Sequence, residues 1–245
     1  MNPYLSSSGL KALARGQLIG HYGTVAGAYL IHMLCIVPIT FTASSLFAAN
    51  TLMNLILSLV SSFLISLVSG FFIAGEAYMY LKLACNQPIT IGDLFWGFQN
   101  ENHKILSLQA VIAGISVLTT LPASIVGYIS GFYPDNGTLN SIYIVLFVAG
   151  LIVNLIASLM LSQTFFLMLD FANYTPAQLL RKSISLMKKN KWRLFLIQLS
   201  FVPLVCLGYL SCCMGLLWVQ PYMMATEANF YLDLIKKQSS AKSSS

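Results

Sequence analysis

The sequence predicts an all-α membrane protein, with six transmembrane helices arranged as three helical hairpins that are each preceded by an amphipathic interfacial helix. Three observations predict this class. The 245 residues are 57% hydrophobic and only 8% charged, whereas an ordinary soluble domain has about 25% charged residues. The apolar residues form long runs, and the 13 Lys and Arg residues lie in a few segments between those runs. This composition excludes a soluble enzyme, a disordered chain and a disulfide scaffold.

The first four apolar runs are each long enough for a transmembrane helix, which needs about 20 apolar residues. The segment Tyr133–Gly137 separates the third run from the fourth, because Pro-Asp and Asn-Gly are strong turn signals. The leader before the first run is long for a signal peptide, and no small-residue cleavage site follows it closely. We therefore expect the first run to be retained as a span. The four runs cover residues 24–48, 51–83, 105–128 and 141–169.

The last apolar run, residues 192–222, is interpreted as part of two spans. It has 31 residues, which is too long for one straight span and short for two. We divide it near Ser211-Cys212-Cys213, which gives spans at 192–210 and 214–234.

The basic residues support this division and set the topology, because basic loops of membrane proteins stay in the cytoplasm. Basic residues precede the first run and lie in the loops after the second and fourth runs, whereas the loops after the first and third runs contain none. Lys236, Lys237 and Lys242 follow the same rule only if the final stretch crosses twice. Six spans therefore place both termini and all 13 basic residues in the cytoplasm. A five-span alternative would leave three lysines outside.

Each pair of spans follows a short segment with the pattern of an amphipathic helix. Thr175-Pro-Ala-Gln178 is a capping box with Pro at the first helical position, and it opens a helix that we expect to reach about Asn190. The segments 90–100 and 8–18 repeat this design. Such helices lie in the membrane interface with the apolar face down. The apolar positions are Leu10, Leu13, Ala14 and Leu18, then Ile91, Leu94, Phe95 and Phe98, and finally Leu179, Leu180, Ile184 and Met187.

The chain is interpreted as a single transmembrane domain of three similar units, at residues 6–85, 88–172 and 175–237. Each unit is an interfacial helix, a span out and a span back. A Ser-rich tail, residues 238–245, is expected to be disordered. Parallel repeats of this kind are a known transporter architecture. The alternative is that any chain of hairpins with basic inner loops looks periodic.

Three groups of residues form motifs in the rest of the chain. The first is Pro221-Tyr222, Thr226, Ala228, Phe230-Tyr231 and Leu234. The second is Ser185–Lys191 with Phe195 and Leu199-Ser-Phe201, and the third is Asp93-Leu-Phe95 with Gly97-Phe98. These motifs resemble those of a family of bacterial membrane proteins known as domain of unknown function 975. In the family, basic residues often precede the third motif. This chain departs from that pattern, because the corresponding stretch, Leu83–Gln87, contains no basic residue. The resemblance implies a six-span, multi-pass protein of the bacterial cytoplasmic (inner) membrane, and it implies no established activity.

Ionisable side chains inside the spans are candidates for function, because they are costly in a bilayer. Glu76 lies in the second span and Glu227 in the sixth, both in the inner half of the bilayer. They either face one cavity and bind a cation or a proton, or reach the interface or bond a Tyr or Asn and fasten helices together. We favour the second interpretation. His32 is the one histidine inside a span, and we favour a hydrogen-bonding role over a proton relay. The candidate polar site comprises Glu76, Glu227, His32, Tyr222 and Asn229.

A basic cluster and a row of glycines are candidates for contact surfaces. The cluster has six cations in 13 residues, and each contributes about 1 kcal/mol of attraction to anionic lipid. Nucleic-acid binding is not expected, because the chain has no soluble module. Glycines at spacings of three or four residues permit close helix contact, which we expect within the monomer rather than in a dimer. The cluster is Arg181, Lys182, Lys188, Lys189, Lys191 and Arg193, and the glycines are Gly16, Gly20, Gly23 and Gly27.

Two functions remain, and neither needs a cofactor. The sequence has no Ser-His-Asp or Cys-His arrangement, phosphate loop or HExxH motif, and no Cys/His spacing typical of zinc. We therefore expect no enzyme and no metal, with intramembrane catalysis by Glu76, Glu227 or Asp170 as the alternative. A non-catalytic accessory, scaffold or immunity-type protein, which binds a membrane-protein partner or a second copy, predicts a closed bundle with an exposed groove or small-residue face. A transporter or carrier of a small solute, peptide or lipid predicts an enclosed polar cavity lined by Glu76 and Glu227. The sparse polar residues in the spans favour the first function.

Overall fold

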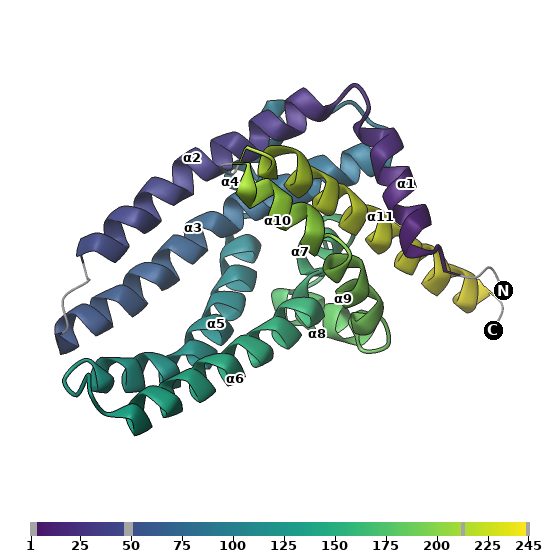
Figure 1. The fold of residues 1–245 in the computed structure, drawn as a ribbon. Coiled ribbons are helices and arrows are strands. Elements are labelled where there is room, and N and C mark those ends of the chain that lie inside the picture. The colour runs from purple at the N-terminus through teal and green to yellow at the C-terminus, as the bar shows by residue number, and fades with distance from the viewer. Residues whose placement is uncertain (1–3, 47–50, 212–213, 244–245) are drawn as a thin grey trace.

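A computed structural model of the chain describes residues 4–46, 51–211 and 214–243, and these ranges contain helices and no strands. The prediction of an all-helical chain is therefore confirmed for the described residues. Figure 1 shows the helices in chain order. They are α1 (Ser7–Leu18), α2 (Tyr22–Leu46), α3 (Leu52–Ala84), the 3-10 helix η1 (Ile91–Phe95), α4 (Trp96–Gln99), α5 (Asn102–Ser130), α6 (Gly137–Leu161), α7 (Thr164–Asp170), α8 (Pro176–Met187), α9 (Lys191–Leu199), α10 (Val202–Leu210) and α11 (Leu216–Ser243).

Five stretches of described helix are long and apolar enough to cross a membrane. They correspond to the first five predicted spans, and they are compatible with a membrane protein. The helix α11 is not among them, because polar residues such as Gln220, Glu227 and Asn229 interrupt its apolar sequence. The six-span arrangement therefore stays a prediction. The five stretches are Tyr22–Leu46, Leu52–Ala84, Asn102–Ser130, Gly137–Asp170 and Lys191–Leu210.

The core lies at one end of the long helices. The buried residues of α2 are Val25 and Ala28, near its start, and those of α3 all lie between Gly70 and Leu83, in its second half. The hairpins α2–α3 and α5–α6 extend away from this core to the left in Figure 1, and both chain ends lie at the right. In each of the first four candidate spans, only 11% of the most apolar stretch is buried. These outer parts present apolar side chains to their surroundings, which is typical of helices in lipid.

The short helices pack on other helices through their apolar faces. Leu10, Ala14 and Leu18 of α1 are fully buried, and this helix packs on α11. The helix α8 packs on α6 and α7, and its predicted capping box is present, since Thr175 N–H donates to Gln178 Oε1 and Gln178 N–H to Thr175 Oγ1. The apolar faces predicted to lie against lipid therefore contribute largely to the protein core.

Some positions of the predicted apolar faces remain outside the core. Leu13 of α1 is 45% exposed and Ile184 of α8 is 38% exposed. The segment η1–α4 buries Leu94, whereas Ile91, Phe95 and Phe98 are exposed. These side chains are the ones still available for contact with lipid.

The segment η1–α4 lies against α3 at unusually close range. A Cβ atom on Gly75 would lie 1.8 Å from the carbonyl oxygen of Leu94, and a Cβ atom on Gly97 would lie 2.4 Å from the carbonyl oxygen of Phe71. Only glycine permits this backbone contact. The ion pair between Lys82 Nζ and Asp93 Oδ2, at 3.0 Å, holds the start of the segment to the end of α3. After α3 ends, the chain thus folds back so that η1 and α4 lie against α3.

The last part of the described chain contains two short helices where the sequence predicts one span. The predicted span 192–210 consists of α9 and α10, with a break before Pro203. The chain turns after α10, near Ser211, as the sequence predicts, and Cys212 and Cys213 lie outside the described residues. The helix α11 continues to Ser243. The described part of the tail, predicted to be disordered, thus extends α11, because its Lys, Gln and Ala residues are compatible with a helix.

Replacing Gly75 by Ala is expected to lower the free energy of unfolding by about 1–3 kcal/mol, because the new methyl group forces η1 away from α3. Thermal unfolding of the purified protein in detergent measures the change. Gly114→Ala in α5 is the matched control, because its Cβ atom would meet nothing within 4 Å. Alanine there improves helix propensity and is expected to leave stability equal or higher. Equal midpoints for the two variants would contradict the close packing of η1 on α3.

Candidate functional site around α11

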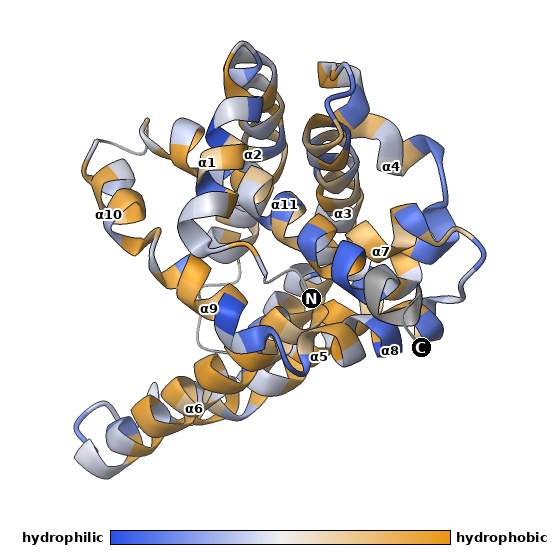
Figure 2. Cartoon of the chain, turned by 90° about the vertical axis from the view of Figure 1, so that its right-hand side faces the viewer, coloured by the Kyte–Doolittle hydropathy of each residue, from blue (hydrophilic) through white to orange (hydrophobic). Residues whose placement is uncertain are grey.

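The polar residues of the helix body converge on α11. This helix contacts α1, α2, α3, α9 and α10, and Figure 2 shows it between α1 and α2 on one side and α3 and α7 on the other. Its polar side chains contact several of the surrounding helices, and these contacts form the candidate site. The buried residues of α11 are Leu216, Pro221, Tyr222, Ala225, Thr226, Ala228, Asn229, Phe230, Tyr231 and Leu234.

Two predicted site residues, Tyr222 and Asn229, bind α1. Asn229 Nδ2 donates to Gln17 Oε1 at 2.6 Å, and Gln17 Nε2 donates to Asn229 Oδ1 at 3.2 Å, so the two amides form a reciprocal pair. Arg15 Nε donates to the hydroxyl of Tyr222 at 2.9 Å. Lys11 lies over the ring of Phe201 at 4.0 Å. Burial, and then the charge of Arg15, lower the pKa of Lys11. Both cations of α1 thus contact aromatic side chains of the protein.

An ion pair joins the second half of α11 to α9. Arg193 Nη2 lies 2.6 Å from Asp233 Oδ2 and donates to the carbonyl oxygen of Leu5 at 2.6 Å. The guanidinium group also lies over the rings of Tyr4 and Phe230. Arg193, one of the six cations of the predicted membrane-surface cluster, thus joins the N-terminal segment, α9 and α11 through its side chain.

The helix α7 is joined to α11 through Asp170 and Tyr231. The hydroxyl of Tyr231 donates to Asp170 Oδ2 at 2.5 Å, and its ring stacks on Phe166 with centroids 5.3 Å apart. Just before α7, Gln163 Nε2 donates to Glu227 Oε1 at 3.3 Å. Glu227 is therefore bound to a neutral amide. Sequence reasoning did not identify Gln163, although a glutamine inside a run of apolar residues was an available signal.

Glu76 has its own partner, His32, on α2. His32 Nδ1 and Glu76 Oε1 are 2.7 Å apart, and His32 Nε2 lies 3.4 Å from Ser69 Oγ. The imidazole ring stacks on Phe72 at 5.0 Å. The structure thus brings together two of the five predicted site residues here. Glu76 and Glu227 bind different helices, and each contact joins one helix to another.

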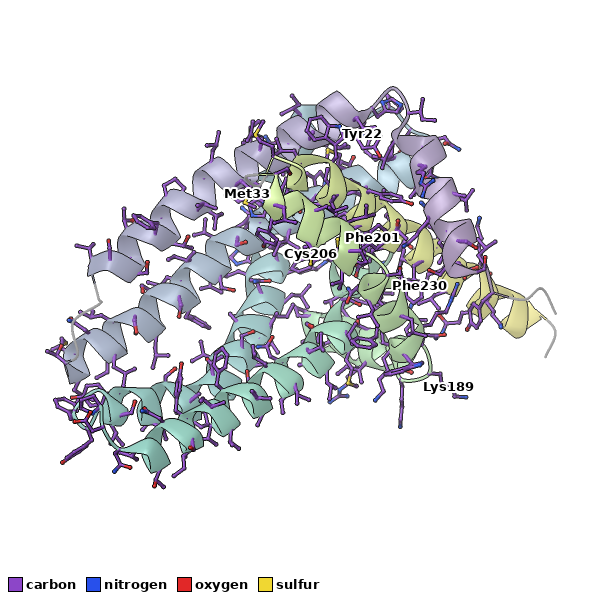
Figure 3. All side chains as sticks on the ribbon, in the orientation of Figure 1. Tyr22, Met33, Lys189, Phe201, Cys206 and Phe230 are labelled. Carbon is purple, nitrogen blue, oxygen red and sulfur yellow. The ribbon has the colours of Figure 1, made fainter. Side chains whose placement is uncertain are left out.

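Of the other five residues of the basic cluster, one packs on aromatic rings and four are exposed. Lys182 lies over the rings of Phe171 and Tyr174, at 3.0 and 4.7 Å from the centroids. Figure 3 shows Lys189 pointing outward at the edge of the molecule, whereas Phe201 and Phe230 lie within it. One exposed cation lies on α8, and three lie around the turn from α8 to α9, where the side chain of Trp192 is 67% exposed. The exposed members are Arg181, Lys188, Lys189 and Lys191.

An open groove of about 610 Å³ follows the outer side of α1. None of the five predicted polar-site residues lines it. Three of the predicted helix-contact glycines, Gly16, Gly20 and Gly23, would carry a Cβ atom with nothing within 4 Å, so they make no close contact in the described part of the monomer. The expected packing of these three within the monomer is therefore wrong, and Gly27 alone touches a neighbour, Ile91. The groove is lined by Leu5, Gly9, Ala12, Leu13, Gly16, Gln17 and Asn86.

The described residues contain no group of three or more His, Cys, Asp or Glu side chains that could hold a metal ion. The described cysteines Cys35, Cys85 and Cys206 are free thiols. What the polar network shows is a set of interhelical pairs around α11 and between α2 and α3. Its chemistry is that of hydrogen bonds and ion pairs between helices.

Replacing Arg193 by Gln is expected to lower the free energy of unfolding by about 2 kcal/mol, because Asp233 keeps its charge and loses its partner. Adding Asp233→Asn to this variant is expected to recover part of the loss, which a double-mutant cycle measured by thermal unfolding would quantify. Arg181→Gln is the matched control, because Arg181 lies on the exposed face of α8. If the free energy of unfolding fell equally little in the Arg193 and Arg181 variants, the Arg193–Asp233 pair would not stabilise the fold as expected.

Comparison with known proteins places the chain in a family. The family model described as protein of unknown function (DUF975) matches residues 1–238. No curated protein and no solved structure matches the chain significantly. The match extends over all the elements of the polar network and includes the three motifs that carry the resemblance. The chain therefore belongs to this family of proteins of unknown function, domain of unknown function 975.

Proposed function

We propose that the protein is a non-catalytic scaffold or accessory protein of the bacterial cytoplasmic membrane, which binds a membrane-protein partner or a second copy of itself. The observation that carries this proposal is the pairing of the polar residues inside the helix body. Glu76 binds His32, Asn229 binds Gln17, and Asp233 binds Arg193. Side chains engaged in this way fix helix positions, and they are poorly placed to bind a passing solute.

The surface of α1 supports the same proposal. A scaffold needs an accessible face on which another helix can lie, and small residues permit close approach of two helices in a membrane. The groove along α1 exposes Gly16, and the neighbouring Gly20 and Gly23 are open as well. The most apolar parts of the long helices are also largely unburied. The outer face of the protein is thus more accessible to a partner than the polar residues inside the helix body.

Transport is the second candidate, and one observation favours it. The fourth candidate span is interrupted between α6 and α7, at Ser162 and Gln163. Interrupted helices form substrate and ion sites in many transporters. This interruption lies beside Glu227, one of the two carboxylates predicted to line a transport cavity.

Cysteine accessibility in sealed vesicles distinguishes the two candidates. In a variant whose five cysteines are replaced by Ser, single cysteines at Ala113 or Ala225 are expected to resist an impermeant maleimide from both sides. Both positions are almost fully buried. Ser239→Cys is the control for the cytoplasmic side and Asp135→Cys for the outside, because both are exposed. Reaction at the buried positions would reveal an aqueous path and would support transport.

The exposed cations near Lys189 support contact with anionic lipid headgroups. Replacing Lys188, Lys189 and Lys191 together by Gln is expected to remove about 1 kcal/mol of attraction per cation. The measurement is the rise in unfolding temperature on adding phosphatidylglycerol, with phosphatidylcholine as the uncharged control lipid. The wild-type protein is expected to gain more from phosphatidylglycerol than the triple variant. An equal rise in unfolding temperature in both proteins would contradict a contact with anionic lipid and would leave these lysines only a role in setting the topology.

A further inference from the structure

The interruption between α6 and α7 brings buried polar groups next to a carboxylate. The helix α6 ends at Leu161 and α7 begins at Thr164, inside an apolar stretch that runs from Gly137 to Asp170. Gln163 and Thr164 are both 0% exposed. Gln163 Nε2 donates to Ser162 Oγ at 2.9 Å and to Glu227 Oε1 at 3.3 Å. Gln163 thus contacts both Ser162 and Glu227, and Thr164 is the next residue in the chain.

Two side-chain oxygens at the interruption have no partner. Gln163 Oε1 and Thr164 Oγ1 are fully enclosed atoms, and no hydrogen bond reaches either of them. A buried polar atom without a partner is unfavourable by about 1–3 kcal/mol, and native proteins contain few of them. Gln109 Oε1 and Arg193 Nη1 are also without a partner, but Gln163 and Thr164 are neighbours in the chain, and their adjacency points to a further group at the site.

The charge at the site is also unbalanced. Glu76, Asp93, Glu101 and Asp233 each have a basic side chain within ion-pair distance. Among the ion pairs of the described residues, none includes Glu227, and the donor that reaches its carboxylate is the neutral amide of Gln163. A carboxylate shielded from water is unfavourable unless a positive charge accompanies it. The Glu227 side chain as a whole is partly exposed.

We propose that Glu227, Gln163 and Thr164 form a binding site for a monovalent alkali cation. Their donor atoms are a carboxylate, an amide oxygen and a hydroxyl, which are the oxygen ligands that hard cations prefer. One negative charge is neutralised by one monovalent ion, whereas a divalent ion would leave a positive charge shielded from water. The ion would connect the end of α6 to α11. This role goes beyond the scaffold function, because it stabilises the fold whether or not the ion is transported.

Thermal unfolding in detergent tests the site, with Na⁺ as the probe and choline at the same concentration as the reference ion. The wild-type midpoint is expected to rise with Na⁺ and to saturate, by about 5 °C at one hundred times the dissociation constant. Glu227→Gln is expected to remove this rise. Thr164→Val, which keeps the volume, is expected to weaken the apparent Na⁺ affinity about tenfold. Glu101→Gln is the matched control and is expected to retain the full rise.

Carbodiimide labelling keeps the proposal testable even if Glu227→Gln does not fold. In the wild-type protein, labelling of Glu227 is expected in choline and is expected to be suppressed by Na⁺, as read by peptide mass mapping. Equal midpoints in Na⁺ and choline, together with labelling that Na⁺ does not change, would overturn the proposal. Water molecules would then be the groups that complete the site. A Na⁺-dependent rise that persists in Glu227→Gln would also overturn it, because the ion would bind elsewhere.

Discussion

The structure depends on one constraint: polar side chains in a poorly hydrated helix body must find partners within the protein. The helix α11 shows this constraint most clearly. Its Tyr222 and Asn229 bind α1, its Tyr231 binds the end of α7, and its Asp233 binds α9. These partners come from all three predicted units of the chain. The helix that is too polar to count as a candidate span is thus the one that holds the others together.

The same constraint explains the uneven distribution of the core. Where polar pairs and close glycine contacts exist, the helices pack tightly, as α3 does on η1 through Gly75. Farther along the α2–α3 hairpin such groups are sparse, whereas in the α5–α6 hairpin Gly150 lies close to the carbonyl oxygen of Thr119 and Asn154 Nδ2 donates to Thr119 Oγ1. In both hairpins many apolar side chains are exposed. Both hairpins extend away from the core (Figure 1). The short helices α1 and α8 cover the polar end of the bundle, and their apolar faces form part of its core.

The sequence predicted the local features of this fold well. Apolar runs located the starts of the long helices to within a few residues, and the capping box at Thr175 located the start of α8, because both signals lie in neighbouring residues. These signals did not predict the end of α6 at Leu161 or the division of the span 192–210 into α9 and α10. The sequence could not predict which polar residues meet. Gln17 and Asn229 are 212 positions apart, and no local pattern connects them. Helix periodicity showed that Leu10 and Leu18 share a face, but the same pattern suits a lipid surface and a protein neighbour. The open surface of Gly16 was missed for the same reason.

Proximity of α1 and α11 in native membranes tests the central role of α11 most directly. Gln17→Cys and Asn229→Cys, in a chain without other cysteines, can be bridged by a short bifunctional thiol reagent if the two helices lie together. We expect efficient bridging of this pair, and no bridging when Gln17→Cys is combined with Ser239→Cys instead. Failure to bridge the first pair, in a protein that reaches the membrane in normal amounts, would contradict the packing of α11 on α1 from which the polar network is built.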